Sequence, residues 1–176
     1  MTRVLILIFL AACEDQDVSK KNTSDDITDF ISSAKEDQFT VDGTNLGDSW
    51  RVVRYKASYW DGDYKKEWDE DYLDLASTRP ECKDYQEFWI FGLNEVMLAF
   101  KGSCFDKNFD GYYEKFNHNF DLPARTITVD YVYDDGEKTY SRRWALSSPS
   151  EDILILTEDI KEEDSFHEYT LRREKF

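Results

Sequence analysis

The sequence holds few residues that break regular structure and few that commonly act in acid–base catalysis. It has only 7 Gly and 3 Pro, which argues against a disordered chain. His118 and His167 are its two histidines, and it contains no Gly-x-Ser-x-Gly, His-x-x-x-His or phosphate-loop motif. Acidic pairs are so common that none stands out as a glycosidase site. We therefore expect no catalytic residues and a protein that is not an enzyme.

Basic residues are scarce beside acidic ones. The chain has 22 Lys and Arg against 38 Asp and Glu, a formal net charge of −16. Such a charge repels phosphate backbones and anionic lipid head groups, so we expect no nucleic-acid partner. It suits solubility, a cationic partner or a bound cation. A length of 176 residues is enough for one domain with its own core.

Long apolar runs are missing except at the beginning of the chain. After Arg3, residues 4–12 are all apolar, but as a helix they would span only about 14 Å. A bilayer core is about 30 Å thick, so this run is too short to cross it. A basic start, an apolar run and small residues are typical of a secretory signal. A buried N-terminal strand is the alternative.

Leu10-Ala11-Ala12-Cys13 resembles the lipobox of bacterial lipoproteins. The resemblance implies cleavage before Cys13, lipidation of Cys13 with acyl chains such as palmitate, and a stable membrane anchor. It places the protein in the bacterial cell envelope. We expect the outer membrane, on its periplasmic side or at the cell surface. The acidic residues Glu14, Asp15 and Asp17 after the cysteine resemble the surface-export signals of some bacterial lipoproteins. The membrane would then be one partner, reached through Cys13.

Two cysteines remain if Cys13 carries lipid. The export that the lipobox implies permits a disulfide between Cys82 and Cys104. Two buried free thiols are the alternative. We favour the disulfide.

Composition divides the chain into three parts. Residues 1–12 are the predicted signal peptide, residues 13–44 a polar tether, and residues 45–176 a β domain. Within the tether, Ile27, Phe30, Ile31 and Ala34 recur at helical spacing and indicate one short helix. This helix could rest on the domain or stay loose, and the sequence favours a tether.

From residue 50 onward, runs rich in β-branched and aromatic residues alternate with turn residues. Asp135-Gly136 is the strongest turn signal, because this pair is favoured in two-residue hairpins. About nine short strands without a long helix predict an all-β antiparallel barrel, with a β-sandwich as the alternative. The expected strands are 50–60, 67–75, 88–93, 96–100, 112–120, 125–133, 140–146, 153–156 and 166–171.

Part of this pattern resembles lipocalin-like domains. Gly47-Asp48-Ser49-Trp50 is similar to their opening motif, although the usual spacing is Gly-x-Trp. Residues 144–146, 153–157 and 169–171 resemble the closing strands of small bacterial lipocalin-like lipoproteins. The resemblance implies a barrel of about eight to ten strands that Trp50 plugs at one end, with an internal pocket for a small apolar or amphipathic ligand.

Two predicted strands suggest which residues would line such a pocket. Alternation places Tyr131 and Tyr133 on one face of their strand, and Tyr140 and Trp144 on one face of the next. Large aromatic side chains either fill a small barrel or line an apolar pocket. These four residues are our candidate ligand-binding residues.

One segment fits the beginning of a calcium-binding loop. Such a loop needs oxygen ligands at positions 1, 3, 5 and 9 and a glycine at position 6, and this segment supplies them with Asp106, Asn108, Asp110 and Glu114 around Gly111. The bidentate glutamate of position twelve is Asn117 here, so a plain turn between strands is the favoured interpretation. We expect no cofactor, with calcium as the weaker alternative.

A second segment spaces aromatic residues four apart among acids, at Trp60, Tyr64, Trp68 and Tyr72. Either helical or strand spacing would keep the four rings on one side. Such rings usually line a core. Exposed, they would form an acidic aromatic surface that binds a glycan or a cationic partner. An interaction module at the envelope is therefore the alternative function.

Overall fold

The computed structural model describes residues 24–36, 40–41, 44–102, 111–133, 138–160 and 163–174. The chain folds into an all-β structure with one longer helix, α1 (Ser24–Glu36), and two short ones, α2 (Leu75–Thr78) and η1 (Pro80–Cys82). The strands are β1 (Thr40–Val41), β2 (Thr44–Asn45), β3 (Ser49–Asp61), β4 (Tyr64–Asp71), β5 (Gln86–Phe91), β6 (Glu95–Lys101), β7 (Tyr112–Asp121), β8 (Thr126–Tyr133), β9 (Lys138–Ser150), β10 (Ile153–Ile160) and β11 (Ser165–Glu174).

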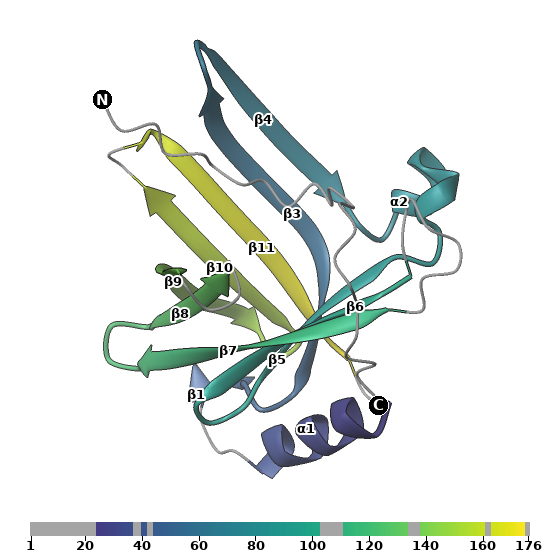
Figure 1. Cartoon of the computed structure of the whole chain (residues 1–176), viewed down its shortest axis with the longest axis vertical. Helices are drawn as coiled ribbons and strands as arrows, with labels where there is room; N and C mark the ends of the chain where they lie inside the picture. The colour runs from purple at the N-terminus through teal and green to yellow at the C-terminus, as the bar shows by residue number, and fades with distance from the viewer. Residues whose placement is uncertain are drawn as a thin grey trace.

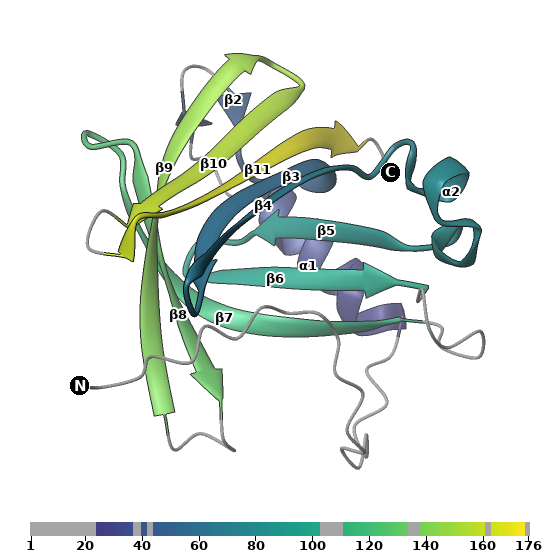
Figure 2. The same ribbon diagram turned by 90° about the horizontal axis from the view of Figure 1, so that it is seen from above.

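Eight of these strands form a closed antiparallel barrel. β5 to β10 each pair with the next strand in sequence, and β3 closes the barrel by pairing with β5 and with β11 (Figures 1 and 2). Each of these eight strands therefore has a partner on both sides, which protects sheet edges that would otherwise invite association. The predicted barrel is therefore confirmed, and the sandwich alternative was wrong.

The ninth long strand, β4, shares one edge of β3 with β5. Arg54 pairs with Asp71 of β4, whereas Arg51 pairs with Phe88 of β5. β4 and β5 thus behave as two halves of one strand, interrupted by residues 72–85. The short helices α2 and η1 lie in this connecting segment.

The connecting segment is held against the end of β6. A Cβ atom on Gly102 would lie only 2.5 Å from the carbonyl oxygen of Asp84, and Gly102 has a φ of +67°. Only glycine, which has no Cβ atom, adopts this positive φ so close to a carbonyl oxygen without strain. This close approach fixes the chain directly before β5 and so positions Tyr85 and Glu87.

Helix α1 packs on the outer face of the barrel. Its buried Ala34 contacts Ile90 of β5 and Met97 of β6, with Phe30 and Ile31 packed around them. Figure 2 shows α1 behind β5, β6 and β7. The predicted helix therefore rests on the domain and is not loose.

The two halves of the barrel interior differ. The end near Trp50 is filled by fully buried side chains, and the Trp50 indole donates a hydrogen bond to the Leu46 carbonyl and lies beneath the Arg173 guanidinium. This end is closed, as the resemblance implied. Its core consists of Val41, Leu46, Trp50, Val52, Phe91, Val96, Ile127, Leu146, Leu154 and Leu171.

Candidate functional site

At the opposite end of the barrel, side chains that face inward are in contact with solvent. Tyr140 is 39% exposed, Glu114 is exposed, and several further aromatic residues at inward-facing positions are half-buried. Inward-facing residues of a filled barrel would be fully buried, as they are near Trp50. We call this region the open end. Its aromatic side chains are those of Tyr55, Tyr72, Tyr85, Phe100, Tyr112, Phe116, Tyr131, Tyr140 and Tyr169.

Glu87 of β5 is buried at the floor of the open end. Its side chain is 8% exposed, and it accepts hydrogen bonds from the Trp89 indole, at 3.2 Å, and from the Tyr85 hydroxyl. Burial disfavours the charged carboxylate and raises the pKa of Glu87 to about 7, although both hydrogen bonds oppose this shift. The group therefore changes its charge near neutral pH.

Tyr169 of β11 lies at the centre of this floor. Its ring centroid is 4.7 Å from that of Tyr55, 5.5 Å from that of Trp89 and 5.6 Å from that of Trp144. Trp89 and Trp144 in turn meet edge to face at 6.1 Å, a favoured geometry for aromatic pairs. Together these rings form a rigid layer beneath the open end, which we call the aromatic floor.

A second polar group lies on β9 and β10. Arg142 and Glu158 form an ion pair, and the Arg142 guanidinium lies 4.8 Å above the Trp144 ring. Burial lowers the pKa of Arg142, but the hydrogen bond and charge of Glu158 more than offset this and raise it overall. The Arg142 charge is therefore already matched within the barrel.

His167 of β11 completes the polar lining. Its Nδ1 lies 2.8 Å from the Tyr55 hydroxyl oxygen, within hydrogen-bond distance. Burial, together with the positive charge of Arg142, lowers the pKa of His167 to about 4. Burial also raises the pKa of Tyr55 to about 12. At neutral pH both groups are uncharged and act only as hydrogen-bonding partners.

This lining suits a ligand that is partly apolar and partly polar. The aromatic floor offers stacking surface, while the tyrosine hydroxyls and Glu87 offer hydrogen-bond partners. The described residues contain no group of three or more His, Cys, Asp or Glu side chains arranged to hold a metal ion. The open end therefore combines an apolar aromatic surface with a small number of hydrogen-bonding groups.

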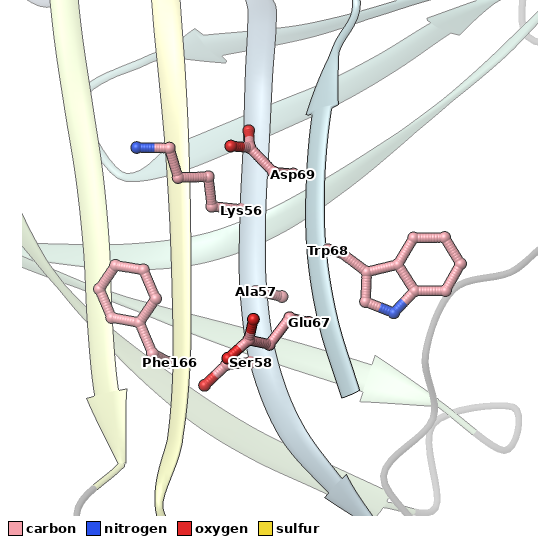
Figure 3. A pocket seen from close by; sticks show the side chains of 7 residues that line it. All are labelled: Lys56, Ala57, Ser58, Glu67, Trp68, Asp69 and Phe166. Carbon is pink, nitrogen blue, oxygen red and sulfur yellow. The ribbon is translucent and has the colours of Figure 1, made fainter. Parts of the chain in front are cut away.

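A second depression, of about 320 Å³, lies on the outer face of β3, β4 and β11 (Figure 3). Lys56 and Phe166 border it, whereas the Trp68 indole points away from them. Two of its three charged side chains are already paired, because Lys56 binds Glu168 at 3.2 Å and Asp69 binds Arg54 at 2.7 Å. This depression is shallow and offers a ligand fewer contacts than the open end does.

The structure brings three of the four candidate ligand-binding residues to the barrel interior. Tyr131 stacks on Tyr140 with ring centroids 5.1 Å apart at the open end. Trp144 is fully buried in the aromatic floor. Tyr133 lies in β8, where its backbone pairs with Lys138, and its side chain is outside the described part of the chain.

Most of the predicted calcium loop lies outside the described residues. This applies to Asp106, Asn108 and Asp110, so calcium binding there stays a prediction. Glu114 lies in β7, paired with Leu98, and therefore faces the barrel interior. Burial raises the pKa of Glu114.

The predicted cysteine chemistry also stays a prediction. Cys13 and Cys104 lie outside the described residues. Cys82 ends η1 in the connecting segment and is 2% exposed.

The prediction that Trp60, Tyr64, Trp68 and Tyr72 share one side was wrong. Trp60 lies on β3 and pairs with Lys65, whereas Tyr64 pairs with Asp61, so the rings of Trp60 and Tyr64 belong to opposite faces of the β3–β4 hairpin. The turn between the strands breaks the even spacing. Trp60 and Tyr64 are 44% and 77% exposed, while Tyr72 packs against the core.

The sequence analysis did not identify Glu87, Arg142, Glu158 and His167 as site residues. A signal was nevertheless present, because each occupies an inward-facing position of its strand. Arg142 lies between Tyr140 and Trp144, and Glu87 is two residues before Trp89. A charged residue at a position that alternation directs into a barrel indicates a buried polar site.

Comparisons with known proteins add no functional information. No family model, curated protein or solved structure matches this chain. Within the part of the chain that the structure describes, no helix has the length and apolar character of a membrane-spanning segment.

Proposed function

We propose that the protein is a lipid-anchored lipoprotein of the bacterial cell envelope whose barrel binds one small amphipathic ligand, without catalysing a reaction. The observation that carries this proposal is the difference in packing between the two ends of the barrel interior. Its interior is fully packed near Trp50, whereas inward-facing aromatic and polar side chains meet solvent at the open end. A closed barrel of about eight strands is either filled by side chains or holds one small ligand, and the solvent contact at the open end favours the second. The mixed lining favours an amphipathic ligand over a purely apolar one.

The binding proposal can be tested with dansyl-labelled amphiphiles that share one short alkyl chain and differ in head group. Energy transfer from the five tryptophans to the dansyl group reports binding of the probe. We expect saturable binding of at least one amphiphile at one molecule per chain. Lack of saturable binding by every head group would contradict the proposal.

A matched pair of variants locates the binding site. Tyr140 faces inward at the open end, whereas Val132, beside it on β8, is 50% exposed on the outer face. We expect Tyr140→Ala to weaken binding about threefold or more, because an aromatic contact contributes about 0.5–1.5 kcal/mol. Val132→Ala should leave the affinity unchanged. Equal effects of the two changes would place the ligand elsewhere.

The anchor is tested separately by labelling cells with radioactive palmitate. Cys13→Ser should abolish incorporation, because the lipobox resemblance makes Cys13 the lipidated residue. A Cys82→Ser variant serves as the matched control and should retain the label. If Cys13→Ser incorporates as much label as the parent, Cys13 is not the site of lipidation.

The alternative function, an interaction module with an acidic aromatic surface, has one supporting observation. Trp60 and Tyr64 are exposed large aromatic residues at the tip of the β3–β4 hairpin. Their rings lie on opposite faces of the hairpin, and the Trp60 indole donates a 3.0 Å hydrogen bond to Asp164. Rings on opposite faces of a hairpin do not form one continuous aromatic surface, so this observation gives the alternative less support than the open end gives the internal site.

A further inference from the structure

Glu87 has no cationic partner within the described part of the chain. Its hydrogen bonds come from Trp89 and Tyr85, and no basic side chain contributes to the shift of its pKa. A buried carboxylate without a counter-ion destabilises a fold. Arg142 by contrast is paired with Glu158. An unpaired carboxyl at the floor of an open site therefore suggests a ligand that supplies the missing positive charge.

Aromatic rings surround this carboxyl from several strands. Tyr55, Tyr72, Tyr112 and Tyr169 all lie close enough to Glu87 for its charge to raise their pKa values. Burial is the larger cause in each case. Their hydroxyls stay protonated, and the faces of their rings carry partial negative charge. Such faces attract ammonium groups, and the attraction increases when the site excludes water.

The balance of charge at the open end is negative at neutral pH. Arg142 and Glu158 neutralise one another, and His167 is uncharged because its pKa is lowered to about 4. Among the described residues at the open end, Glu87 and Glu114 remain as the unmatched groups. An anionic head group would be repelled by both carboxylates and would find the Arg142 guanidinium already occupied.

We propose that the open end selects amphipathic organic cations, meaning amines or quaternary ammonium compounds with an apolar body, and that Glu87 is their counter-ion beneath a cage of tyrosine rings. This inference rests on the internal binding site of the proposed function and names its ligand class. The head group would lie between Glu87 and Tyr169. The apolar body would point along the open end toward Phe100 and Phe116.

The test compares three dansyl probes with the same linker and three head groups. One carries trimethylammonium, one the uncharged isosteric tert-butyl group, and one a carboxylate. At pH 8 Glu87 is ionised, so we expect the wild-type protein to bind the ammonium probe at least about tenfold more tightly than the tert-butyl probe, and the carboxylate probe most weakly. This comparison needs no variant.

Two variants then assign the preference to one residue. Glu87→Gln should remove the preference for ammonium while it leaves affinity for the tert-butyl probe nearly unchanged. Glu95→Gln is the matched control, because it neutralises an exposed carboxylate on the outer face of β6, next to inward-facing Val96, and it should keep the preference. Circular dichroism checks that both variants keep the fold.

The possible outcomes distinguish failure of the cation proposal from failure of the proposed internal binding site. If no probe binds, the internal site itself is wrong. If the tert-butyl or carboxylate probe binds as tightly as the ammonium probe, the site exists but the cation proposal is wrong. If Glu87→Gln keeps the full preference for ammonium, Glu87 is not the counter-ion.

Discussion

The indole nitrogen of Trp89 donates a 3.2 Å hydrogen bond to the carboxyl of Glu87, two residues before it on β5. Alternate residues of a strand share a face, so both side chains point into the barrel. Trp89 belongs to the packed half of the interior, while Glu87 faces the open half. This pair therefore marks the boundary between the core and the proposed site, and several predictions depend on it.

The first prediction concerns the pH dependence of stability through Glu87. Its pKa is about 7 in the folded protein against an ordinary value of 4.5. A raised carboxyl pKa stabilises the fold below pH 4.5, and this contribution is lost as the pH rises to about 7. The difference corresponds to about 3 kcal/mol. Between pH 4.5 and pH 8, the unfolding free energy of Glu87→Gln relative to wild type should rise by about this amount, as measured by urea denaturation. An unchanged difference across the range would contradict the burial of an unpaired acid.

The second prediction concerns His167, whose effect has the opposite sign. Its pKa is lowered from 6.5 to about 4, so its contribution to stability is present above pH 6.5 and is lost as the pH falls toward 4. Between pH 4.5 and 6.5 the effects of Glu87 and His167 oppose one another. Wild-type stability should therefore change less in this range than that of Glu87→Gln, which should rise with pH, or that of His167→Gln, which should fall. A wild-type slope as steep as either variant's would refute this compensation.

A third prediction tests the closed end. Trp50 is fully buried, and the Arg173 guanidinium lies 5.4 Å from the centroid of its ring. Trp50→Ala should lower the unfolding free energy by about 3–5 kcal/mol because it leaves a cavity. A double-mutant cycle with Arg173→Met should show a coupling of about 1 kcal/mol from the cation–π contact. Strictly additive effects would mean that Arg173 contributes nothing through Trp50.

A fourth prediction concerns the cysteines. If Cys82 and Cys104 form the predicted disulfide, the intact mass of the non-reduced protein should lie about 2 Da below that of the dithiol form. Cys82 lies in the segment that leads to Tyr85 and Glu87, so reduction should also weaken binding of the ammonium probe. Rapid alkylation of both thiols in the native exported protein would show that no bond is present.

The sequence predicted the strands well and their long-range pairing poorly. Alternation located all nine long strands, from β3 to β11, but it missed β1 and β2, which are only two residues each. It also treated β4 and β5 as separate strands. Nothing local indicates that both lie along the same edge of β3, because that pairing is set by residues far apart in the chain.

The candidate site was predicted only in its aromatic part. Tyr131, Tyr140 and Trp144 stood out because aromatic residues at alternating positions favour an interior face. Glu87 and Arg142 occupy equivalent positions, but a charged side chain usually indicates a solvated face. Their burial depends on partners such as Trp89 and Glu158 that come from other positions or other strands. Only the closed barrel brings these partners together.

The proposed site is tested most directly by a crystal structure of the protein with the trimethylammonium probe bound. We expect one probe molecule inside the barrel, with its head group against Glu87 and Tyr169 and its apolar body toward the open end. A probe bound only on the outer surface, for example in the depression beside Lys56 and Phe166, would contradict the proposal that the barrel interior is the binding site.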